Sequence, residues 1–280
     1  MEPFKPDHVA ITPEDVASPQ PGGRFFFLPG SFGRARAIAE SFTDVRTFSS
    51  SRGYDVHTGR LTRGGRTIDA GVVATGMGCP SVDCVVTELI ALGLRSFLRI
   101  GSAGSVAPAR VKAGHVVIAS AAVRDENASL AYAPPEFPAL ASLAILDAAR
   151  RAAGSIAAAG VVHTGVVLTK DSMFGREFGF GPRGAANLEY GKWMARLGVL
   201  ASEMEAAHLF ILAQVYSAWP VLPEGTPGAP PLLPLHAGCI LAVIGDEHNG
   251  LCDAATMDAT TTRAVDLGLA TAVEFVEQQW

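Results

Sequence analysis

Short apolar runs alternate with amphipathic stretches along almost the whole chain, and this alternation limits the folds the chain can adopt. Strands are predicted where Val, Ile and other apolar residues cluster, at 24–28, 54–61, 67–75, 96–101, 115–123, 164–169 and 238–245. Helices are predicted where apolar residues recur every three or four positions, at 33–42, 81–92, 140–153, 204–216 and 256–276. Strands interleaved with helices form a largely buried mixed or parallel sheet. The sequence therefore predicts an α/β layered fold.

The composition is even from one end of the chain to the other. Of the 280 residues, 49% are hydrophobic and 18% charged, which is enough apolar surface for a substantial core. Because the sequence shows no internal repeat and no second compositional regime, we expect residues 1–280 to form a single domain. The proline-rich segment 219–238 is expected to be a loop or extended arm between a helix and a strand.

Charge and cysteine content narrow the partners and the compartment. The net charge of −5 argues against a nucleic-acid partner, because affinity for a phosphate backbone comes from clustered Lys and Arg. The four cysteines lack C-x-x-C spacing, which predicts a reducing, cytoplasmic setting. Neither a signal-peptide pattern nor an apolar run of membrane-spanning length occurs, so no membrane partner is expected.

Three arginines lie beside glycine-containing segments: Arg34 follows "LPGSFG", Arg52 precedes "GYD", and Arg99 precedes a predicted turn at 101–104. Planar guanidinium groups and the N–H groups of glycine-rich turns bind an oxyanion such as phosphate, and Ser102 adds a hydroxyl. Arginines near turns are also commonly solvated or paired with a carboxylate. Arg99 fits that second interpretation least, because it lies within a predicted buried strand.

The segment "VATGMGCPSVD" superficially resembles a dinucleotide-binding fingerprint. Gly76 and Gly78 are followed by Pro80 and Ser81 where a third glycine is required, and the acidic residue that would anchor a ribose is missing. A tight turn with proline near a helix start is the preferred interpretation.

Two carboxylates flank Met204 in "SEMEAAHLF". Glu205 can accept both hydroxyls of a vicinal diol, with Met204 packed against a sugar. Alternatively, Glu203 and Glu205 mark an exposed helix N-terminus, where acidic residues favour the helix dipole. The spacing alone does not decide between the two interpretations.

A long apolar run ends in Asp246, Glu247 and His248. Because ligands gather beyond the carboxyl ends of strands in α/β sheets, Asp246 is a candidate proton donor with a raised pKa. The alternative is an ordinary turn aspartate. His8 has the pattern of a surface residue, and no histidine shows metal-ligand spacing.

Together these segments resemble the nucleoside phosphorylase family and, within it, the uridine phosphorylases. The resemblance extends over nearly the whole chain and is carried by residues 28–35, 75–104, 128–140 and 202–210, in that order. It implies a three-layer α/β/α sandwich around a mixed, partly barrel-like sheet, assembled as homodimers that often form homohexamers. By the resemblance, Gly30, Arg34, Arg99 and Ser102 bind phosphate and Arg52 does so across a subunit interface. Met204, Glu205 and Ser102 hold ribose, together with His8 of a neighbouring subunit.

The expected base pocket departs from the uridine phosphorylase pattern. Those enzymes have a Gln-x-Arg pair that contacts uracil, whereas "DSMFGREFG" here has Arg176 and Glu177, and Asp246 replaces an asparagine, which is the purine phosphorylase pattern. Gly53 follows Arg52 where some relatives have a cation-binding glutamate, so no metal is expected. The predicted base-binding residues are Ala103, Gly104, Met173, Phe174, Arg176, Glu177 and Asp246.

The resemblance implies a phosphorylase that cleaves the N-glycosidic bond of a nucleoside with phosphate as co-substrate and without a cofactor. Arg99, Glu205 and Asp246 are the expected catalytic residues. The alternatives are a purine nucleoside phosphorylase with Asp246 as the acid, a hydrolytic nucleosidase, and a non-catalytic nucleoside-binding protein. The three arginines argue against the nucleosidase, which has no use for a phosphate site.

Overall fold

The strands join into one mixed sheet that partly closes on itself. A computed structural model describes residues 4–155, 161–246 and 250–278. Its strands are β1 Phe25–Pro29, β2 Phe42–Phe48, β3 Val56–Arg63, β4 Arg66–Val73, β5 Ser96–Ser105, β6 Val116–Asp125, β7 Ala139–Leu140, β8 Val162–Lys170, β9 Ala201–Glu203, β10 His236–Asp246 and β11 Gly250–Leu251. Its helices are α1 Pro13–Val16, α2 Phe32–Ala39, α3 Cys79–Ala91, α4 Leu143–Ser155, α5 Gly184–Arg196, α6 Ala206–Ala218 and α7 Ala254–Glu277, with a 3-10 turn η1 Ala128–Ala131 and a π-helical turn η2 Met173–Glu177.

The order of the strands produces a barrel at one end of the sheet. Neighbouring strands run β11-β10-β6-β8-β9-β5-β1-β4-β3-β2, and β10 also pairs with β5. The strands β5, β10, β6, β8 and β9 therefore form a closed ring. Strand β5 is parallel to β1 and β10 but antiparallel to β9, so the sheet is mixed. The predicted mixed, partly barrel-like sheet is confirmed.

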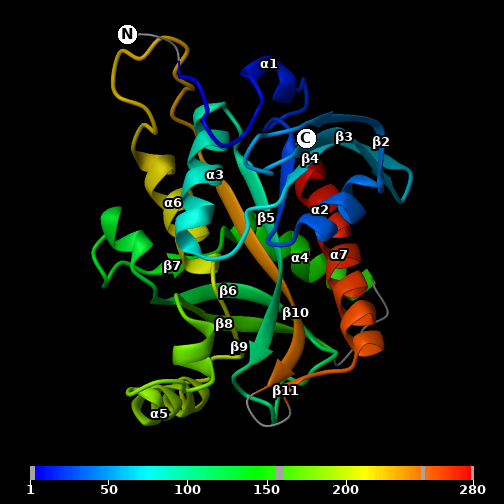
Figure 1. Ribbon diagram of the computed structural model, residues 1–280. Helices are drawn as coiled ribbons and strands as arrows, with labels where there is room; N and C mark the ends of the chain where they lie inside the picture. Colours follow the sequence, from blue (N-terminus) through cyan, green and yellow to red (C-terminus); the bar gives the residue numbers. More distant parts are fainter. Residues whose placement is uncertain (1–3, 156–160, 247–249, 279–280) are drawn as a thin grey trace.

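Helices cover both faces of the sheet (Figure 1). On one face, α3 and α6 bury Leu89 and Phe210 in a core that includes Phe26 and Phe97. On the other face, α2, α4 and α7 pack on residues of the opposite strand faces, such as Leu98. The two largest parts of the core are thus apolar layers separated by the sheet, and the predicted three-layer α/β/α arrangement is confirmed. Among the described residues, no helix is long and apolar enough to cross a membrane.

Strand β5 continues through the segment that the sequence predicted to be a turn. Residues 101–104 were expected to leave the sheet, but β5 extends to Ser105 and pairs with β10 along nearly its whole length. The glycines serve close packing there. A Cβ on Gly101 would lie 2.7 Å from Arg99 Nη2, and one on Gly104 would overlap Glu177 Oε1. Small residues in this half of β5 leave room for charged side chains beside the strand.

Several other boundaries differ from the prediction. Helix α2 ends at Ala39, and residues 42–48 form strand β2, whose mostly exposed residues lack the apolar pattern of a buried strand. Helices α1 and α5 and the short strands β7 and β11 were not predicted. The predicted helix stop at Gly93 is confirmed, because this residue follows α3 with φ of +98°. Residues 219–235 contain no helix or strand, as expected for a connector.

Candidate functional site

A pocket of about 570 Å³ lies where β1, β4, β5, β8, β9 and β10 end or bend together. Eleven of the predicted site residues line it: Gly30, Arg34, Arg99, Ser102, Ala103, Gly104, Met173, Glu177, Met204, Glu205 and Asp246. Four predicted residues do not: His8, Arg52, Phe174 and Arg176. The fold therefore collects most of the expected side chains, from distant parts of the chain, around one cavity.

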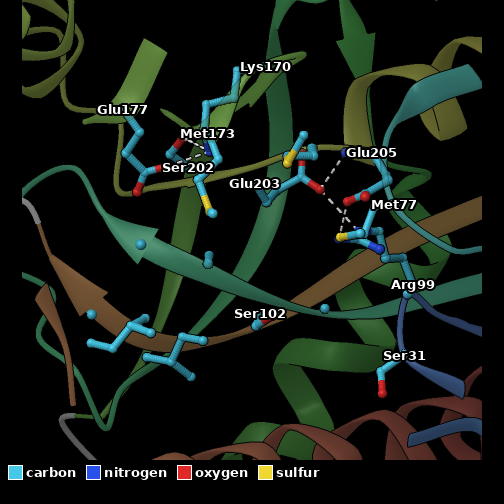
Figure 2. Close-up of a pocket in the computed structure, with 18 of the residues that line it drawn as sticks. Ser31, Met77, Arg99, Ser102, Lys170, Met173, Glu177, Ser202, Glu203 and Glu205 are labelled. Atoms are coloured by element: carbon cyan, nitrogen blue, oxygen red, sulfur yellow. Dashed lines mark hydrogen bonds and ion pairs between the residues drawn. The ribbon is translucent and has the colours of Figure 1, made fainter. Parts of the chain in front are cut away.

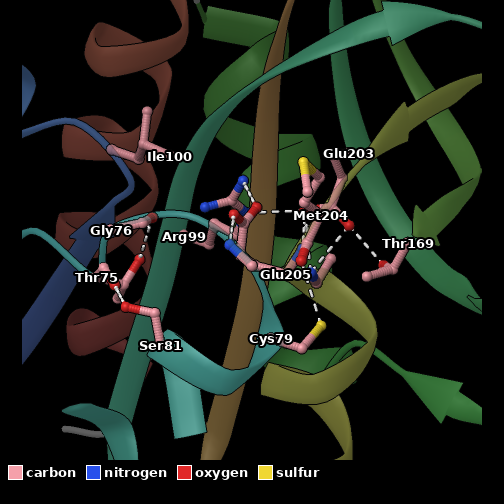
Figure 3. Close-up of polar contacts among 12 residues, drawn as sticks. Thr75, Gly76, Cys79, Ser81, Arg99, Ile100, Thr169, Glu203, Met204 and Glu205 are labelled. Atoms are coloured by element: carbon pink, nitrogen blue, oxygen red, sulfur yellow. Dashed lines mark hydrogen bonds and ion pairs between the residues drawn. The ribbon is translucent and has the colours of Figure 1, made fainter. Parts of the chain in front are cut away.

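Arg99 is held between two buried glutamates (Figure 3). Its Nε donates to Glu203 Oε2 at 3.0 Å, and its Nη2 is ion-paired with Glu205 Oε2. Burial opposes the charged form of Arg99, but the charges of Glu205 and Glu203 prevail and raise the pKa of the guanidinium above its usual range. The two carboxylates thus account for a cation in the middle of a buried strand, and the expectation that Arg99 is the arginine least suited to carboxylate pairing is wrong.

Glu203 fixes the start of helix α6. Its carboxylate accepts hydrogen bonds from the N–H groups of Glu205, at 2.8 Å, and Ala206, at 2.9 Å, and from the hydroxyl of Thr169. Glu203 is 2% exposed and Glu205 3% exposed, so the interpretation of an exposed, acidic helix N-terminus is wrong. Carboxylates at this helix start are stabilised by its free N–H groups and are directed inward.

Glu205 joins the arginine to the turn before α3. Its Oε1 accepts the N–H of Gly78 at 2.6 Å. Burial raises the pKa of the Glu205 carboxyl; the charge of Arg99 opposes this shift, and the charge of Glu203 adds to it. Gly78 precedes α3 with φ of +87° and Pro80 lies in the first turn, so the predicted tight turn is confirmed and supplies this amide.

Arg34 approaches the same region from helix α2. Its Nη1 donates to the carbonyl of Ile100 at 3.0 Å, and both burial and the charge of Arg99 lower the pKa of Arg34. Arg34 Nε and Arg99 Nη1 are buried and have no hydrogen-bond partner among the described residues. A Cβ built on Gly30 would lie 3.7 Å from Arg99 Nη1. Two neighbouring cations with unused N–H groups favour an anion between them.

A second cluster of charges lies at the other end of the pocket (Figure 2). Lys170 ends strand β8 and is 3% exposed; its Nζ donates to Ser202 Oγ at 2.7 Å and is ion-paired with Glu177 Oε2. Lys170 and Ser202 were not predicted as site residues. The signal for Lys170 was a lysine ending the apolar run "VVLTK", which resembles the placement of Arg99.

We call Arg34, Arg99, Glu203 and Glu205 the arginine end, and Lys170, Glu177 and Ser202 the lysine end.

Asp246 lies at the carboxyl end of β10 and lines the pocket, opposite Ser105 in the β5 register. Its neighbours Glu247 and His248 lie outside the described residues. Met173 and Met204 add thioether side chains to the wall. The role of Asp246 as a proton donor stays a prediction.

His8 and Arg52 lie outside this pocket. The Nδ1 of His8 contacts Glu88 Oε1 at 2.7 Å, and the same carboxylate accepts the N–H groups of Asp7, His8 and Val9. Arg52 lines a separate hollow of about 330 Å³ together with Arg36 and other residues. Within one protomer neither side chain reaches the pocket. Their assignment to a neighbouring subunit's site stays a prediction.

Arg176 and Phe174 also face away from the pocket. Arg176 forms a two-pronged ion pair with Asp125, donates to Asn187 Oδ1 at 2.9 Å and lies over the ring of Tyr190. Asp125 raises the pKa of Arg176 by hydrogen bonding. Phe174 packs with two other phenylalanines at the surface and is 58% exposed. In this arrangement Arg176 secures the turn that carries Met173 and Glu177 into the pocket.

One group of possible metal ligands lies nearby. Atoms of Cys79, Glu126 and Asp171 lie within 4.8 Å of one another. The thiol of Cys79 donates to the carbonyl of Met204 at 3.2 Å. Burial and the surrounding carboxylates raise the pKa of that thiol well above its usual range, which opposes the thiolate that a metal requires. The expectation that no metal takes part stays a prediction.

Comparisons with known proteins agree with this architecture. A family model described as the phosphorylase superfamily matches residues 24–222. The uridine phosphorylase of Thermococcus kodakarensis is 34% identical over 245 residues, covering 85% of this chain and 76% of that protein. The uridine phosphorylase of Treponema pallidum is 36% identical over 211 residues, covering 74% and 76%. A DeoD-type purine nucleoside phosphorylase of Streptococcus pneumoniae is 34% identical over 212 residues, covering 75% and 80%. The chain belongs to the phosphorylase superfamily.

Proposed function

We propose that this protein is a nucleoside phosphorylase of the uridine phosphorylase type. It transfers the pentosyl group of a nucleoside to inorganic phosphate, and the products are a free base and ribose 1-phosphate or its deoxy form. The single observation that carries the proposal is the pair of unused guanidinium N–H groups, on Arg34 and Arg99, in a pocket that also holds Glu205. Similarity to two uridine phosphorylases over most of the chain supports it.

The phosphate occupies the arginine end. Arg99 Nη1 and Arg34 Nε donate hydrogen bonds to the phosphate, and Gly30 and Ser102 complete its binding site. Arg34 and Arg99 repel one another in the empty site, and a dianion between them removes that repulsion. Glu203 and Glu205 keep Arg99 charged and in one orientation before phosphate arrives, so little reorganisation accompanies binding.

The ribose lies between phosphate and base, against Met204 and Glu205. Each carboxylate oxygen has a second lone pair, so Glu205 can accept a ribose hydroxyl while it keeps Gly78 and Arg99. In the reaction, a phosphate oxygen forms a bond to the anomeric carbon, the C1′–N bond breaks, and its electron pair leaves with the base. The transition state has oxocarbenium character, so anions near the sugar stabilise it. Catalysis comes from positioning and electrostatics.

The active assembly is a homodimer or a homohexamer in which His8 and Arg52 of a neighbouring subunit complete each site. The position of both side chains outside their own protomer's pocket supports this arrangement. Phosphate is the only co-substrate, and no cofactor or metal takes part. Four unpaired cysteines support a reducing, cytoplasmic setting.

Purine nucleosides are the second candidate substrates. Asp246 lines the pocket, and an aspartic acid at this position suits a departing purine because it can protonate the ring nitrogen. Similarity to a DeoD-type purine nucleoside phosphorylase supports this alternative. The two candidates share the arginine end and differ only in the base.

One assay tests the proposal. Uridine, thymidine, inosine and adenosine are incubated with and without phosphate, and free base and pentose 1-phosphate are quantified. We expect phosphate-dependent release of base, with uridine among the best substrates. Release without phosphate would identify a nucleosidase, and no turnover of any nucleoside would support a non-catalytic binding protein.

A further inference from the structure

We infer that Lys170 and Glu177 together recognise the base through a lactam edge, which is a carbonyl next to a ring N–H, and that Lys170 also stabilises the departing base. The inference rests on the proposed function and adds the chemical class of base to it. Uracil, thymine and hypoxanthine present such an edge, whereas cytosine and adenine present an amino group next to an unprotonated ring nitrogen.

The lysine end is built into the pocket wall. Lys170 is the last residue of β8, Ser202 belongs to β9 and Glu177 ends the turn η2, so three separate segments contribute. Figure 2 shows these three side chains grouped away from Arg99 and Glu205. With phosphate at the arginine end and ribose against Met204, the base occupies the rest of the pocket, which the lysine end lines together with Ile244 and Asp246 of β10.

A buried ammonium group is costly, and this one is only partly compensated. Nζ has three N–H donors, and the described residues use two of them, through Ser202 and Glu177. Buried ion pairs can often be replaced by apolar residues without loss of stability, so stability alone does not explain a buried lysine at this position. A ligand carbonyl is the acceptor that the third donor requires.

Glu177 supplies the complementary acceptor. Its Oε2 contacts Lys170, while Oε1 accepts no hydrogen bond from the described residues. This oxygen lies so close to β5 that a Cβ on Gly104 would overlap it. Because Gly104 has no side chain, the Glu177 carboxylate can extend into the pocket, where Oε1 can accept a hydrogen bond from the N–H of a base.

An adjacent donor and acceptor match a lactam edge in both polarity and order. Lys170 donates to the carbonyl oxygen, and Glu177 accepts the ring N–H. Against cytosine or adenine, the ammonium faces an amino group and the carboxylate faces a ring lone pair, so both contacts become repulsive. A site that pairs buried polar groups with its substrate rejects an analogue that leaves them unpaired.

The same geometry assists bond breaking. As the C1′–N bond breaks, its electron pair enters the base and negative charge accumulates on the carbonyl oxygen. The hydrogen bond from the Lys170 ammonium strengthens as that charge grows, so it stabilises the transition state more than the bound nucleoside. No proton has to leave Lys170 in this step, because the base departs as a hydrogen-bonded anion.

The test compares leaving groups. Phosphorolysis of uridine and 5-fluorouridine, whose base is the better leaving group, is measured for the wild type and for Lys170→Met. We expect Lys170→Met to lower kcat/KM for uridine by about 100-fold, to affect 5-fluorouridine less, and to leave the KM for phosphate unchanged. Lys192→Met removes a surface lysine that pairs with Glu189 at 3.5 Å, and it should change none of these values. Equal losses on both nucleosides would overturn the catalytic part of the inference.

A second variant tests recognition. Glu177→Gln keeps the shape of the side chain and an acceptor oxygen, but its amide can also donate to the ring lone pair of cytosine or adenine. We therefore expect the preference of the enzyme for uridine over cytidine, and for inosine over adenosine, to shrink by about tenfold or more. An unchanged preference, or a wild type that cleaves cytidine as well as uridine, would overturn the lactam assignment. The proposed function is tested separately, because wild-type dependence on phosphate requires neither variant. If the wild type cleaves nucleosides without phosphate, the comparison of uridine with 5-fluorouridine still tests the role of Lys170.

Discussion

The two ends of the pocket differ in which hydrogen-bonding groups they leave unused. At the arginine end the carboxylates are engaged while N–H groups of Arg34 and Arg99 lack partners among the described residues. At the lysine end the Lys170 ammonium uses two of its three N–H groups on Ser202 and Glu177, and Glu177 Oε1 accepts no hydrogen bond from the described residues. The first end therefore suits an anion, and the second suits a group that carries a carbonyl acceptor beside an N–H donor. A ligand with phosphate at one end and a base at the other satisfies both.

Each end of the pocket holds a buried cation, which needs its own counter-charge. The Arg99 guanidinium faces two glutamates, which hold it in place before phosphate binds. Lys170 faces one carboxylate, and that carboxylate belongs to the turn η2 rather than to a strand. We infer that the arginine end is the rigid part of the site and that differences in base specificity arise from the segment around η2.

The largest expected effect is that of Arg99→Ala. Loss of one arm of a desolvated anion site costs about 2–5 kcal/mol in kcat/KM, expressed mainly as a higher KM for phosphate. Steady-state kinetics with varied phosphate measures it. Because the variant also leaves Glu203 and Glu205 buried without their cation, Arg34→Ala serves as a companion at a more exposed position.

Arg95→Ala is the matched control for Arg99→Ala. Arg95 is also buried, but it donates to the carbonyls of Ile90, Leu94 and Pro231 and does not line the pocket. We expect it to lower stability and to leave the KM for phosphate unchanged. The same phosphate dependence in Arg99→Ala and wild type would contradict the assignment of the arginine end.

Asp246→Asn separates the two base classes. If Asp246 protonates a departing purine, the amide should lower inosine cleavage by about 100-fold, in the range for loss of a general acid, and change uridine cleavage far less. Paired measurements of kcat/KM on the two nucleosides give the ratio directly. Equal losses on both would mean that Asp246 only shapes the end of β10.

Glu205→Gln links function to stability. The variant loses charged hydrogen bonds to ribose, about 1.5 kcal/mol or roughly tenfold in kcat/KM for the nucleoside. The folded-state pKa of Glu205 is raised, above all by burial, so this group contributes stability below its unfolded pKa and loses it as the pH rises through the folded value. Relative to wild type, the variant should therefore gain thermal stability between acidic and neutral pH. A Tm difference that does not change with pH would contradict this account.

The arginine end could be predicted from the sequence because local pattern defines it. A charged residue inside the apolar run "FLRIG", a glycine turn before a helix and two glutamates at a helix start are each visible within about ten residues. Their convergence follows from the rule that the carboxyl ends of strands in α/β sheets form the ligand site. What the sequence did not reveal is that Glu203 and Glu205 neutralise Arg99, since this depends on the closure of β9 onto β5.

The lysine end could not be predicted in the same way. Glu177 is the last residue of the π-helical turn η2, which follows Lys170 in the chain. The contact between the two side chains also requires that Gly104, on another strand, has no side chain. The sequence predicted both Arg176 and Glu177 as base-binding residues; Glu177 lines the pocket, whereas the fork of Arg176 is taken by Asp125. A change of one position in a turn reverses which side chain faces inward, and no periodic pattern marks it.

The smallest expected effect concerns Glu88, a buried glutamate outside the pocket whose pKa is shifted in the opposite direction from that of Glu205. Burial opposes the shift, but the hydrogen bonds from His8 and from the N–H groups of Asp7, His8 and Val9 prevail and lower the pKa of Glu88. A carboxyl with a lowered folded-state pKa contributes stability above its unfolded pKa and loses it as the pH falls through the folded value. Glu88→Gln should therefore destabilise the protein by about 1 kcal/mol at neutral pH.

The pH profile of Glu88→Gln sharpens the contrast with Glu205→Gln. The Tm of Glu88→Gln should converge with that of the wild type in acid, whereas Glu205→Gln should diverge from the wild type as the pH rises. Because Glu88 lines no part of the pocket and acts only by anchoring the segment that carries His8, its loss should lower kcat/KM for the nucleoside a few-fold and leave the KM for phosphate unchanged. An unchanged kcat/KM for the nucleoside would contradict the proposal that His8 completes a neighbouring subunit's site.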